Sequence, residues 1–498
     1  MKKKIILISC FFLMMGCSSY IPETEISDMN AIDNIGNEST KVKDDKNMVF
    51  STEKWWLIYN DPILNELMEL TLEANSDLKI AMLNIEKAKI TVEGAENSAF
   101  KAGLYASGNY YGTSQSYTKS KAIGPAPIGV PEDAFAGETM YGAGAGLKMS
   151  YNFNFYDKYG NLAKSQSFLA ESAIFKTKSV ELSITTNLAK LYGYYIYLSK
   201  ESANLNERLE TLTALEEKVE KIIEFGNGTP EDLLPIQNKI LALKQFINLN
   251  EFNRKATIET INSLSSYKYK EDIDRILNAS TSKKLLDQDF LIPSKVSSDV
   301  IVNRPDVQYY LMLIESEKAK LIAAKSDFYP QISIGGDIGY RGLGFDNSFQ
   351  DFSSLMWSFG PKVYLPIFNL SGVKTQYKVA GVQINIFVEN YNKTINGAIK
   401  EINDNLTSVQ MAKRNYENSE KNYENNKIIY DNSNLKLEIG SISEYKNLND
   451  KYVYLGAAIR KEQQNYKVYS EQIDLINSLG GVYKTKAEIE KELANQNK

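Results

Sequence analysis

The sequence predicts an α+β membrane protein in which paired β-strands and very long helices occur twice along one chain. Three observations predict this class. An export signal opens the chain, two long stretches have the composition of extended helices, and four short segments have the residue pattern of strands. The repetition of these elements predicts two copies of one structural unit, so we treat the chain as an internal two-fold repeat.

The first 16 residues predict a signal peptide. Three lysines, Lys2 to Lys4, precede a short apolar run that is too short to span a bilayer as a helix. The run ends in Gly16-Cys17, which resembles the lipid-attachment motif of bacterial lipoproteins. Cys17 is therefore expected to be the first mature residue and to carry lipid, and Ser18 after it resembles lipoproteins sent to the outer membrane. The alternative is an ordinary signal peptide with an incidental cysteine.

Composition argues against enzymes and nucleic-acid binders. The chain has no histidine, which excludes Ser-His-Asp and Cys-His catalysis and every His-ligated metal site. Its net charge of −5 becomes about −8 without the three signal lysines, and no basic face is evident. Cys10 leaves with the signal, so the mature chain has no disulfide. We expect no catalytic residue, cofactor, metal site or nucleic-acid partner.

The first repeat is expected over residues 55–265, after a polar tether at 17–54. Asp61-Pro62 is typical of a helix start, with Asp as N-cap and Pro at the first helical position, and the helical pattern continues to about Phe100. Alternating apolar residues, Leu147 to Phe155, indicate a strand with one apolar and one wet face. The expected elements are strands at about 102–113 and 140–156, a long helix at 157–224 and a return helix.

Two glycine-containing turns join the long helices to their return helices. The first turn contains Gly226 and Gly228, and Thr229 then starts the next helix as N-cap, with Asp232 completing a capping box. Residues 439–444 match residues 227–232 at an offset of 212, which predicts a second turn at Gly440 and a second capping box from Ser441 and Glu444. Asp232 and Glu444 are therefore interpreted as helix caps.

The second repeat is expected over residues 303–483, between a linker at 266–302 and a tail at 484–498. Its strands are expected at about 331–341 and 356–368. In its long helix Tyr416, Tyr423 and Tyr430 recur at sevens among polar residues. Such a thin apolar seam fits either a helix of a hollow tube or an ordinary exposed coiled coil, and the pattern leaves both open.

Four strands cannot hide their edges in lipid, where every backbone group must be paired. The chain therefore needs identical neighbours. Three copies would give a barrel of about 12 strands, an allowed outer-membrane size, but the pattern itself demands only more than one copy.

Several stretches in this order resemble the TolC-type outer-membrane efflux proteins, specifically their lipoprotein branch. The resemblance covers residues 55 to about 483. It is carried by these stretches: Trp55-Trp56, Asp61-Pro62, Ala74 to Leu78, Tyr151 to Gly160, Asn303-Arg304-Pro305-Asp306-Val307, Phe328-Tyr329-Pro330, Leu365-Pro366-Ile367-Phe368 and Ser478 to Gly481.

The resemblance implies the outer-membrane factor of a resistance–nodulation–division tripartite efflux system. It implies a homotrimer with a 12-stranded outer-membrane barrel, a long periplasmic helical barrel and an equatorial domain. Expected partners are a periplasmic adaptor, an inner-membrane pump and outer-membrane lipid. The alternatives are the outer-membrane channel of a type I protein secretion system, and a periplasmic coiled-coil structural lipoprotein without a pore.

The resemblance also supplies candidate site residues. The tip turns expected to contact the adaptor contain Gly226, Gly228, Thr229, Gly440 and Ser441. The positions that match the family's periplasmic gate are Tyr445, Lys446 and Asn449. The family often has Asp at the last of these, so Asn449 favours an aromatic or hydrogen-bonded constriction instead of a ring of carboxylates.

Overall fold

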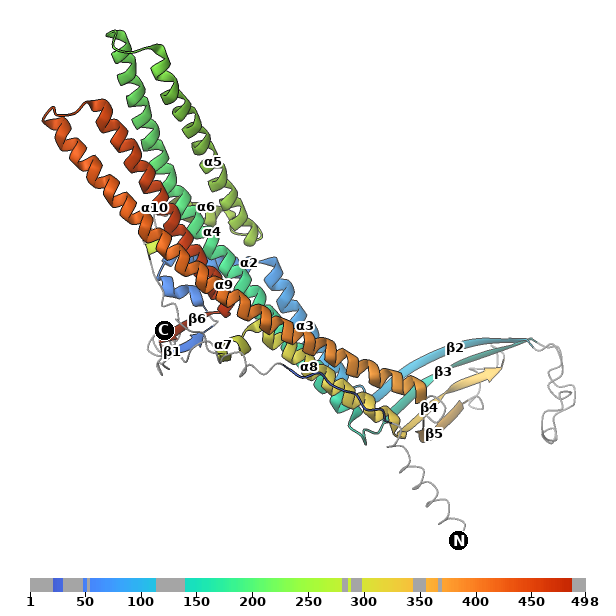
Figure 1. Ribbon diagram of the computed structural model, residues 1–498. Helices are drawn as coiled ribbons and strands as arrows, with labels where there is room; N and C mark the ends of the chain where they lie inside the picture. The colour runs from blue at the N-terminus through green and yellow to red at the C-terminus, as the bar shows by residue number, and fades with distance from the viewer. Residues whose placement is uncertain are drawn as a thin grey trace, which may run out of the picture. The chain divides into compact units, whose positions relative to one another are not determined.

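The computed structural model describes most of the chain, and helices dominate it (Figure 1). The described residues are 21–29, 48–51, 54–112, 139–279, 285–287, 298–343, 355–365 and 370–485. Cys17 and the first 20 residues lie outside them. The chain divides into two compact units, one of residues 1–27, 87–170 and 312–387 and the other of residues 28–86, 171–311 and 388–498.

The first unit contains one antiparallel sheet. Its strands are β2 (Phe100–Gly112), β3 (Thr139–Asn152), β4 (Gln331–Leu343) and β5 (Leu355–Tyr364), and they pair in the order β2-β3-β4-β5. The sheet thus joins a hairpin from each half of the sequence. Within the described residues, β2 and β5 are its edges.

The two hairpins meet between β3 and β4 at a close approach of two glycines. Gly146 lies opposite Gly339, and a Cβ atom added to Gly146 would stand 2.4 Å from the Ile338 carbonyl oxygen. A side chain at this position would push the two strands apart, so glycine is required for the pairing.

The expectation of a strand running to Tyr156 is wrong by four residues. β3 ends at Asn152, and the Asn154 side-chain oxygen accepts a hydrogen bond from the Tyr159 backbone N–H at 3.0 Å. Asp157 has a left-handed φ of 50° and lies just before the long helix. A local turn therefore replaces the end of the strand, although the alternation of apolar residues continues through Phe155.

The second unit is built from two helical hairpins. In the first, α4 (Lys158–Glu224) returns as α5 (Leu234–Leu264) through a turn and a short 3₁₀ segment, η4 (Pro230–Leu233). In the second, α9 (Leu370–Glu438) returns as α10 (Glu444–Leu479). The amino-terminal parts of α4 and α9 belong to the first unit. Among the described residues, no helix has the length and apolar character to cross a bilayer.

A continuous apolar core anchors the helices of this unit. Trp55, in the 3₁₀ segment η3 (Trp55–Tyr59), donates from its indole N–H to the Thr185 hydroxyl at 3.0 Å. Tyr59 packs edge-on against Tyr469 of α10 at 5.3 Å between ring centroids. Burial of these large rings stabilises the core, since each aromatic side chain removes a large apolar area from water.

The helix expected from Pro62 to about Phe100 is two helices. α2 (Pro62–Ala74) ends at Asn75, and α3 (Ser76–Glu96) follows directly. The Asn75 side chain accepts from the Leu78 N–H at 2.9 Å and donates to the Leu264 carbonyl at 2.8 Å. Asn75 therefore caps the second helix and ties it to the end of α5, a contact that the apolar spacing along the sequence does not reveal.

Shorter elements complete the fold. They are the helices α6 (Lys270–Ala279), α7 (Ser298–Val302) and α8 (Pro305–Lys325), the 3₁₀ segments η5 (Leu285–Asp287) and η6 (Ser326–Phe328), and the strands β1 (Met48–Ser51) and β6 (Val482–Thr485). β1 pairs with β6 in antiparallel register.

Parts of the tether expected at 17–54 are held by the fold. Besides the strand β1, residues 21–29 lie along α9, where Asn385 accepts from the Ser27 N–H at 2.8 Å and donates to the Glu25 carbonyl at 3.0 Å. The polar composition of the segment predicted a free tether, but residues 48–51 pair with β6, and the Asn385 side chain bonds to the backbone at Glu25 and Ser27.

Candidate functional site at the two hairpin turns

The two turns have the same backbone geometry and lie at the same end of the helical hairpins (Figure 1). Gly226 and Gly440 both adopt the left-handed conformation, with φ of 74° and 68°. Beyond each glycine a backbone N–H bonds back to the last helical turn, from Asn227 to the Ile222 carbonyl at 3.0 Å and from Ser441 to the Lys436 carbonyl at 2.8 Å. These are glycine-terminated helix ends, in which a residue with Cβ would be strained.

The two turns correspond at an offset of 214 residues, two more than the offset of 212 taken from the sequence. The left-handed glycines are separated by 440 − 226 = 214 positions, and the N-caps Thr229 and Ser443 by 443 − 229 = 214. The offset of 212 is therefore wrong at this point. It was drawn from Gly228 and Gly440, which share a residue type but not a conformation.

Only the first of the two expected capping boxes is present. The Asp232 carboxylate accepts from the Thr229 backbone N–H at 2.8 Å and from its hydroxyl at 3.1 Å. In the second turn the N-cap is Ser443, whose hydroxyl accepts from the Lys446 N–H at 3.3 Å. The box expected from Ser441 and Glu444 is wrong because Glu444 is already the first residue of α10.

Each turn presents one large apolar side chain to the surface. Phe225 is 80% exposed and Ile439 is 79% exposed, and each directly precedes the left-handed glycine. Sequence reasoning singled out the glycines but not these neighbours. An apolar residue directly before a turn is the feature of the sequence that could have indicated them, because exposed apolar side chains often mark interaction sites.

Ion pairs join the two hairpins beside the turns. The Lys218 Nζ lies 2.5 Å from the Glu444 Oε2, and the Lys451 Nζ lies 2.9 Å from the Glu207 Oε1. The hydrogen bond to Glu207 raises the pKa of Lys451 above its usual value. Both pairs connect α4 with α10, so the two hairpins are held to each other near their tips.

A buried amide holds α10 to α9 at the same level. The Asn447 Nδ2 donates to the Asn434 Oδ1 at 2.7 Å and to the Ser433 hydroxyl at 3.4 Å. Asn447 is buried, and a buried polar group is stable only with such partners. The start of the return helix is thus fixed on both sides, by Glu444 toward α4 and by Asn447 toward α9.

Similarity to known proteins agrees with this architecture. The sequence profile of the outer membrane efflux protein family matches residues 296–481. A probable efflux pump outer membrane protein of Pseudomonas putida, TtgC, is 25% identical over 362 residues, with 71% of this chain and 69% of the relative covered. A probable outer membrane lipoprotein of Salmonella typhimurium, SilC, is 23% identical, with 81% and 82% covered.

The fold matches a solved channel. The structure of the Campylobacter jejuni outer membrane channel CmeC aligns with a TM-score of 0.71 and covers 96% of this chain and 98% of that one, at 19% identity. In sequence and in fold, the chain is similar to the TolC-type outer-membrane efflux proteins. This family is one of channel proteins and not of enzymes.

The predicted gate residues lie in the first two turns of α10. Tyr445 is exposed and Asn449 is half-buried, four residues later. Lys446 forms an ion pair with the carboxylate of Asp450, which is buried. Asp450 is therefore neutralised within its own helix, while Tyr445 and Asn449 share the adjacent face.

No group of carboxylates among the described residues is arranged to hold a metal ion.

The tyrosines that recur at sevens in the second long helix have packing partners within the protein. Tyr423 and Tyr430 pack on Tyr454 of α10 at 5.4 and 5.5 Å between ring centroids, and the Tyr423 and Tyr454 hydroxyls are 3.1 Å apart. The tyrosine heptad therefore joins α9 to α10.

Proposed function

We propose that this protein is the outer-membrane channel of a tripartite efflux pump and acts as a passive conduit. Three copies would enclose one pore that carries small molecules such as drugs, toxic compounds or metals to the exterior. The protein itself would catalyse no reaction, and an inner-membrane pump would supply the energy. TtgC and SilC are named as outer-membrane proteins, and TtgC as part of an efflux pump.

One observation carries the proposal: the sheet is apolar on one face and polar on the other. Leu104, Leu147, Ile338 and Trp357 lie opposite one another across all four strands. Leu104 is 85% exposed and Trp357 is 75% exposed. A water-soluble protein rarely exposes such a continuous apolar row, whereas the outer surface of a membrane barrel requires it.

The neighbouring row faces the other way and is polar. Lys148, Asp337 and Ser358 lie opposite one another, and the Ser358 hydroxyl donates to the Asp337 carboxylate. Lipid on the apolar face and water on the polar face would satisfy both rows. This arrangement supports a barrel with a wet interior.

The strand order supports closure by identical neighbours. β2 and β5 are the edges of the described sheet, and edges cannot remain unpaired in lipid. Pairing β2 of one copy with β5 of the next would make a closed ring, and three copies would give about 12 strands, within the known range of such barrels. The two halves of each chain would be copies of one ancestral unit, with α4, α5, α9 and α10 contributing to a helical barrel and the shorter elements to an equatorial domain.

The tip turns are proposed as the docking surface for a periplasmic adaptor. Phe225 and Ile439 offer apolar contacts, while Gly226, Gly228 and Gly440 let a partner approach the backbone closely. Thr229 and Ser441 flank them with hydroxyl groups.

The lipid anchor is proposed at Cys17, which lies outside the described residues. Glu25 and Ser27 are hydrogen-bonded to Asn385 of α9, so only a short segment separates the proposed lipid at Cys17 from the fold. A localisation follows in which the sheet lies in the outer membrane, the lipid inserts at its periplasmic face and most of the helical part is periplasmic.

The direct test combines mass and conductance. The purified protein in nonionic detergent is expected to have the native mass of three acylated chains, and planar bilayers containing it are expected to show discrete channel currents. A monomer, or a trimer without currents, would exclude a channel. A Cys17→Ser variant that still incorporated labelled fatty acid would exclude the proposed anchor alone.

A further inference from the structure

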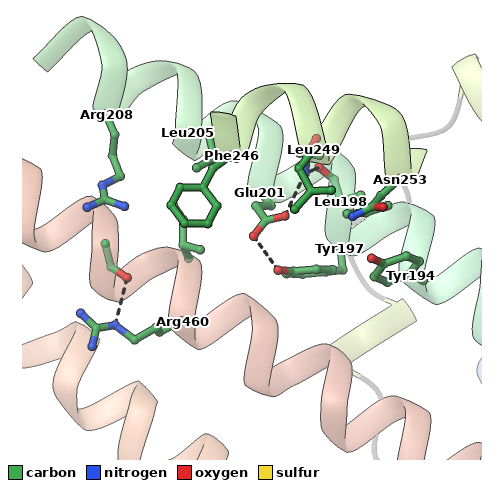
Figure 2. Close-up of a pocket in the computed structure, with 13 residues that line it drawn as sticks. Tyr194, Tyr197, Leu198, Glu201, Leu205, Arg208, Phe246, Leu249, Asn253 and Arg460 are labelled. Atoms are coloured by element: carbon green, nitrogen blue, oxygen red, sulfur yellow. Dashed lines mark hydrogen bonds between the residues drawn. The ribbon is translucent and has the colours of Figure 1, made fainter. Parts of the chain in front are cut away.

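A cavity of about 360 Å³ lies among α4, α5 and α10, away from the tip turns (Figure 2). Two arginines line one end of it, Arg208 from α4 and Arg460 from α10. Figure 2 shows the tyrosines Tyr194 and Tyr197 at the other end, with Phe246 of α5 between the two groups. The cavity thus has a cationic end and an aromatic body.

Among the described residues, an aromatic ring and not a carboxylate holds the Arg208 guanidinium. Its guanidinium lies over the Tyr452 ring, 4.2 Å from the centroid. A Cβ atom added to Gly456 of α10 would stand 3.3 Å from the Arg208 Nη2, so the glycine leaves room for the guanidinium against the helix. Burial lowers the pKa of Arg208, and the nearby Arg460 lowers it further.

One N–H donor of the Arg208 guanidinium has no hydrogen-bond partner among the described residues. This donor, the Nε, is buried, and no acidic side chain in that part of the chain pairs with it. An unsatisfied buried donor on a cation is costly, because both the charge and the N–H lose water. Arg460 adds a second cation, whose Nε makes only a long contact of 3.5 Å with the Gly456 carbonyl.

Glu201, the one carboxylate among the described residues that line the cavity, does not neutralise the arginines. The Glu201 Oε1 accepts from the Tyr197 hydroxyl at 2.6 Å, and its Oε2 accepts from the Asn250 Nδ2 at 2.8 Å. Both oxygens are thus satisfied by neutral donors at the tyrosine end. The arginine end keeps two positive charges and an unused N–H.

We propose that this cavity binds a small organic anion, a carboxylate or sulfonate carried on an aromatic ring. The anionic group would bond to Arg208 and Arg460, since guanidinium donors match two-oxygen anions well. The ring would lie against Phe246 and Leu249, which line the cavity and are both exposed. Such a site, apolar with a few convergent polar groups, has the usual composition of a small-molecule pocket. It stands apart from the tip turns and needs no flow through the pore.

The probe for the test is 4-(trifluoromethyl)benzoate, followed by fluorine NMR on the full-length protein in nonionic detergent. The neutral isostere 4-(trifluoromethyl)benzamide reports binding by the ring alone. The variants are Arg208→Gln and Arg460→Gln, the latter at an exposed residue whose loss should not affect folding. Arg254→Gln on α5 removes the same charge outside the cavity lining and serves as the matched control.

We expect saturable binding of the benzoate at millimolar concentrations, weakened about tenfold or more by either cavity variant, as loss of one charged hydrogen bond predicts. The benzamide should bind at least tenfold more weakly, and Arg254→Gln should leave the affinity unchanged. Equal binding of benzoate and benzamide would overturn the proposal, and so would retained affinity in both cavity variants. Absence of saturable binding to the wild-type oligomer would also overturn it.

Discussion

Lys218, near the end of α4, forms an ion pair of 2.5 Å with Glu444, the first residue of α10. The two residues belong to different hairpins and to different halves of the sequence. Their side chains are partly exposed, so the pair contributes little to overall stability, less than about 1 kcal/mol. Its importance is positional, because it joins the two hairpins beside their tips.

Reversing one charge of this pair should loosen the tip. Lys218→Glu places two carboxylates together, and we expect a larger mean conductance in planar bilayers. The double variant Lys218→Glu with Glu444→Lys restores an ion pair and should return the conductance to the wild-type value. If the double variant conducts like the single one, the pair does not hold the hairpins together.

Two glycine-to-alanine changes, one in α9 and one in the turn after it, should change the free energy of unfolding in opposite directions. Gly440 has a left-handed φ of 68° and open space around a Cβ, so alanine there is strained by conformation alone and should cost about 1–2 kcal/mol. Gly397, in mid-helix with equally open space, should gain about 0.5–1 kcal/mol as alanine. Denaturant unfolding of the two variants measures both values. Equal effects would show that the turn does not require a left-handed residue.

The proposed constriction makes a prediction for conductance. Removing the two side chains with Tyr445→Ala and Asn449→Ala should widen the entrance and increase single-channel conductance. Val453→Ala, at an exposed apolar residue about two turns further along α10, is the control and should leave the conductance unchanged. Unchanged conductance in the double variant would remove these residues from the gate.

The contact between Glu420 and Lys461 predicts that the thermal stability of the protein depends on pH. The hydrogen bond from Lys461 lowers the pKa of Glu420, with a smaller contribution from Tyr416. A carboxyl group whose folded pKa is lowered stabilises the protein above its unfolded value, near 4.5, and loses that contribution as the pH falls through the folded pKa. The wild type should therefore unfold at a higher temperature than Glu420→Gln at pH 7, and the difference should vanish at low pH. A difference that grew on acidification would contradict the assignment.

Local signals in the sequence were reliable where the partners are close along the chain. Asp61 was expected to cap a helix, and its Oδ1 accepts from the Ile63 and Leu64 N–H groups, both at 2.9 Å. The end of α4 at Glu224 also agrees with the glycine-containing turn after it. In each case the cap and the groups that it satisfies lie within a few residues.

Features that depend on remote partners were missed. The break at Asn75 depends on the Leu264 carbonyl, and the strand at Met48 depends on Val482 to Thr485. The two-residue error between the turns has another cause. Residue identity aligned Gly228 with Gly440, whereas backbone conformation pairs Gly226 with Gly440. The arginine cavity was not foreseen either, since its walls combine consecutive helices, α4 and α5, with α10 from the other half of the sequence.

The fluorescence of Trp357 reports directly whether the apolar face of the four-stranded sheet meets lipid. The chain has three tryptophans, and the other two, Trp55 and Trp56, are buried in the second unit. In vesicles of brominated phosphatidylcholine, which quenches tryptophan at the bilayer, we predict quenching in the wild type that is lost in Trp357→Phe. Moving the tryptophan by one residue, with Trp357→Phe and Ser358→Trp, places it on the polar face and should give no quenching. Equal quenching from both faces, or none from Trp357, would contradict a lipid-facing sheet.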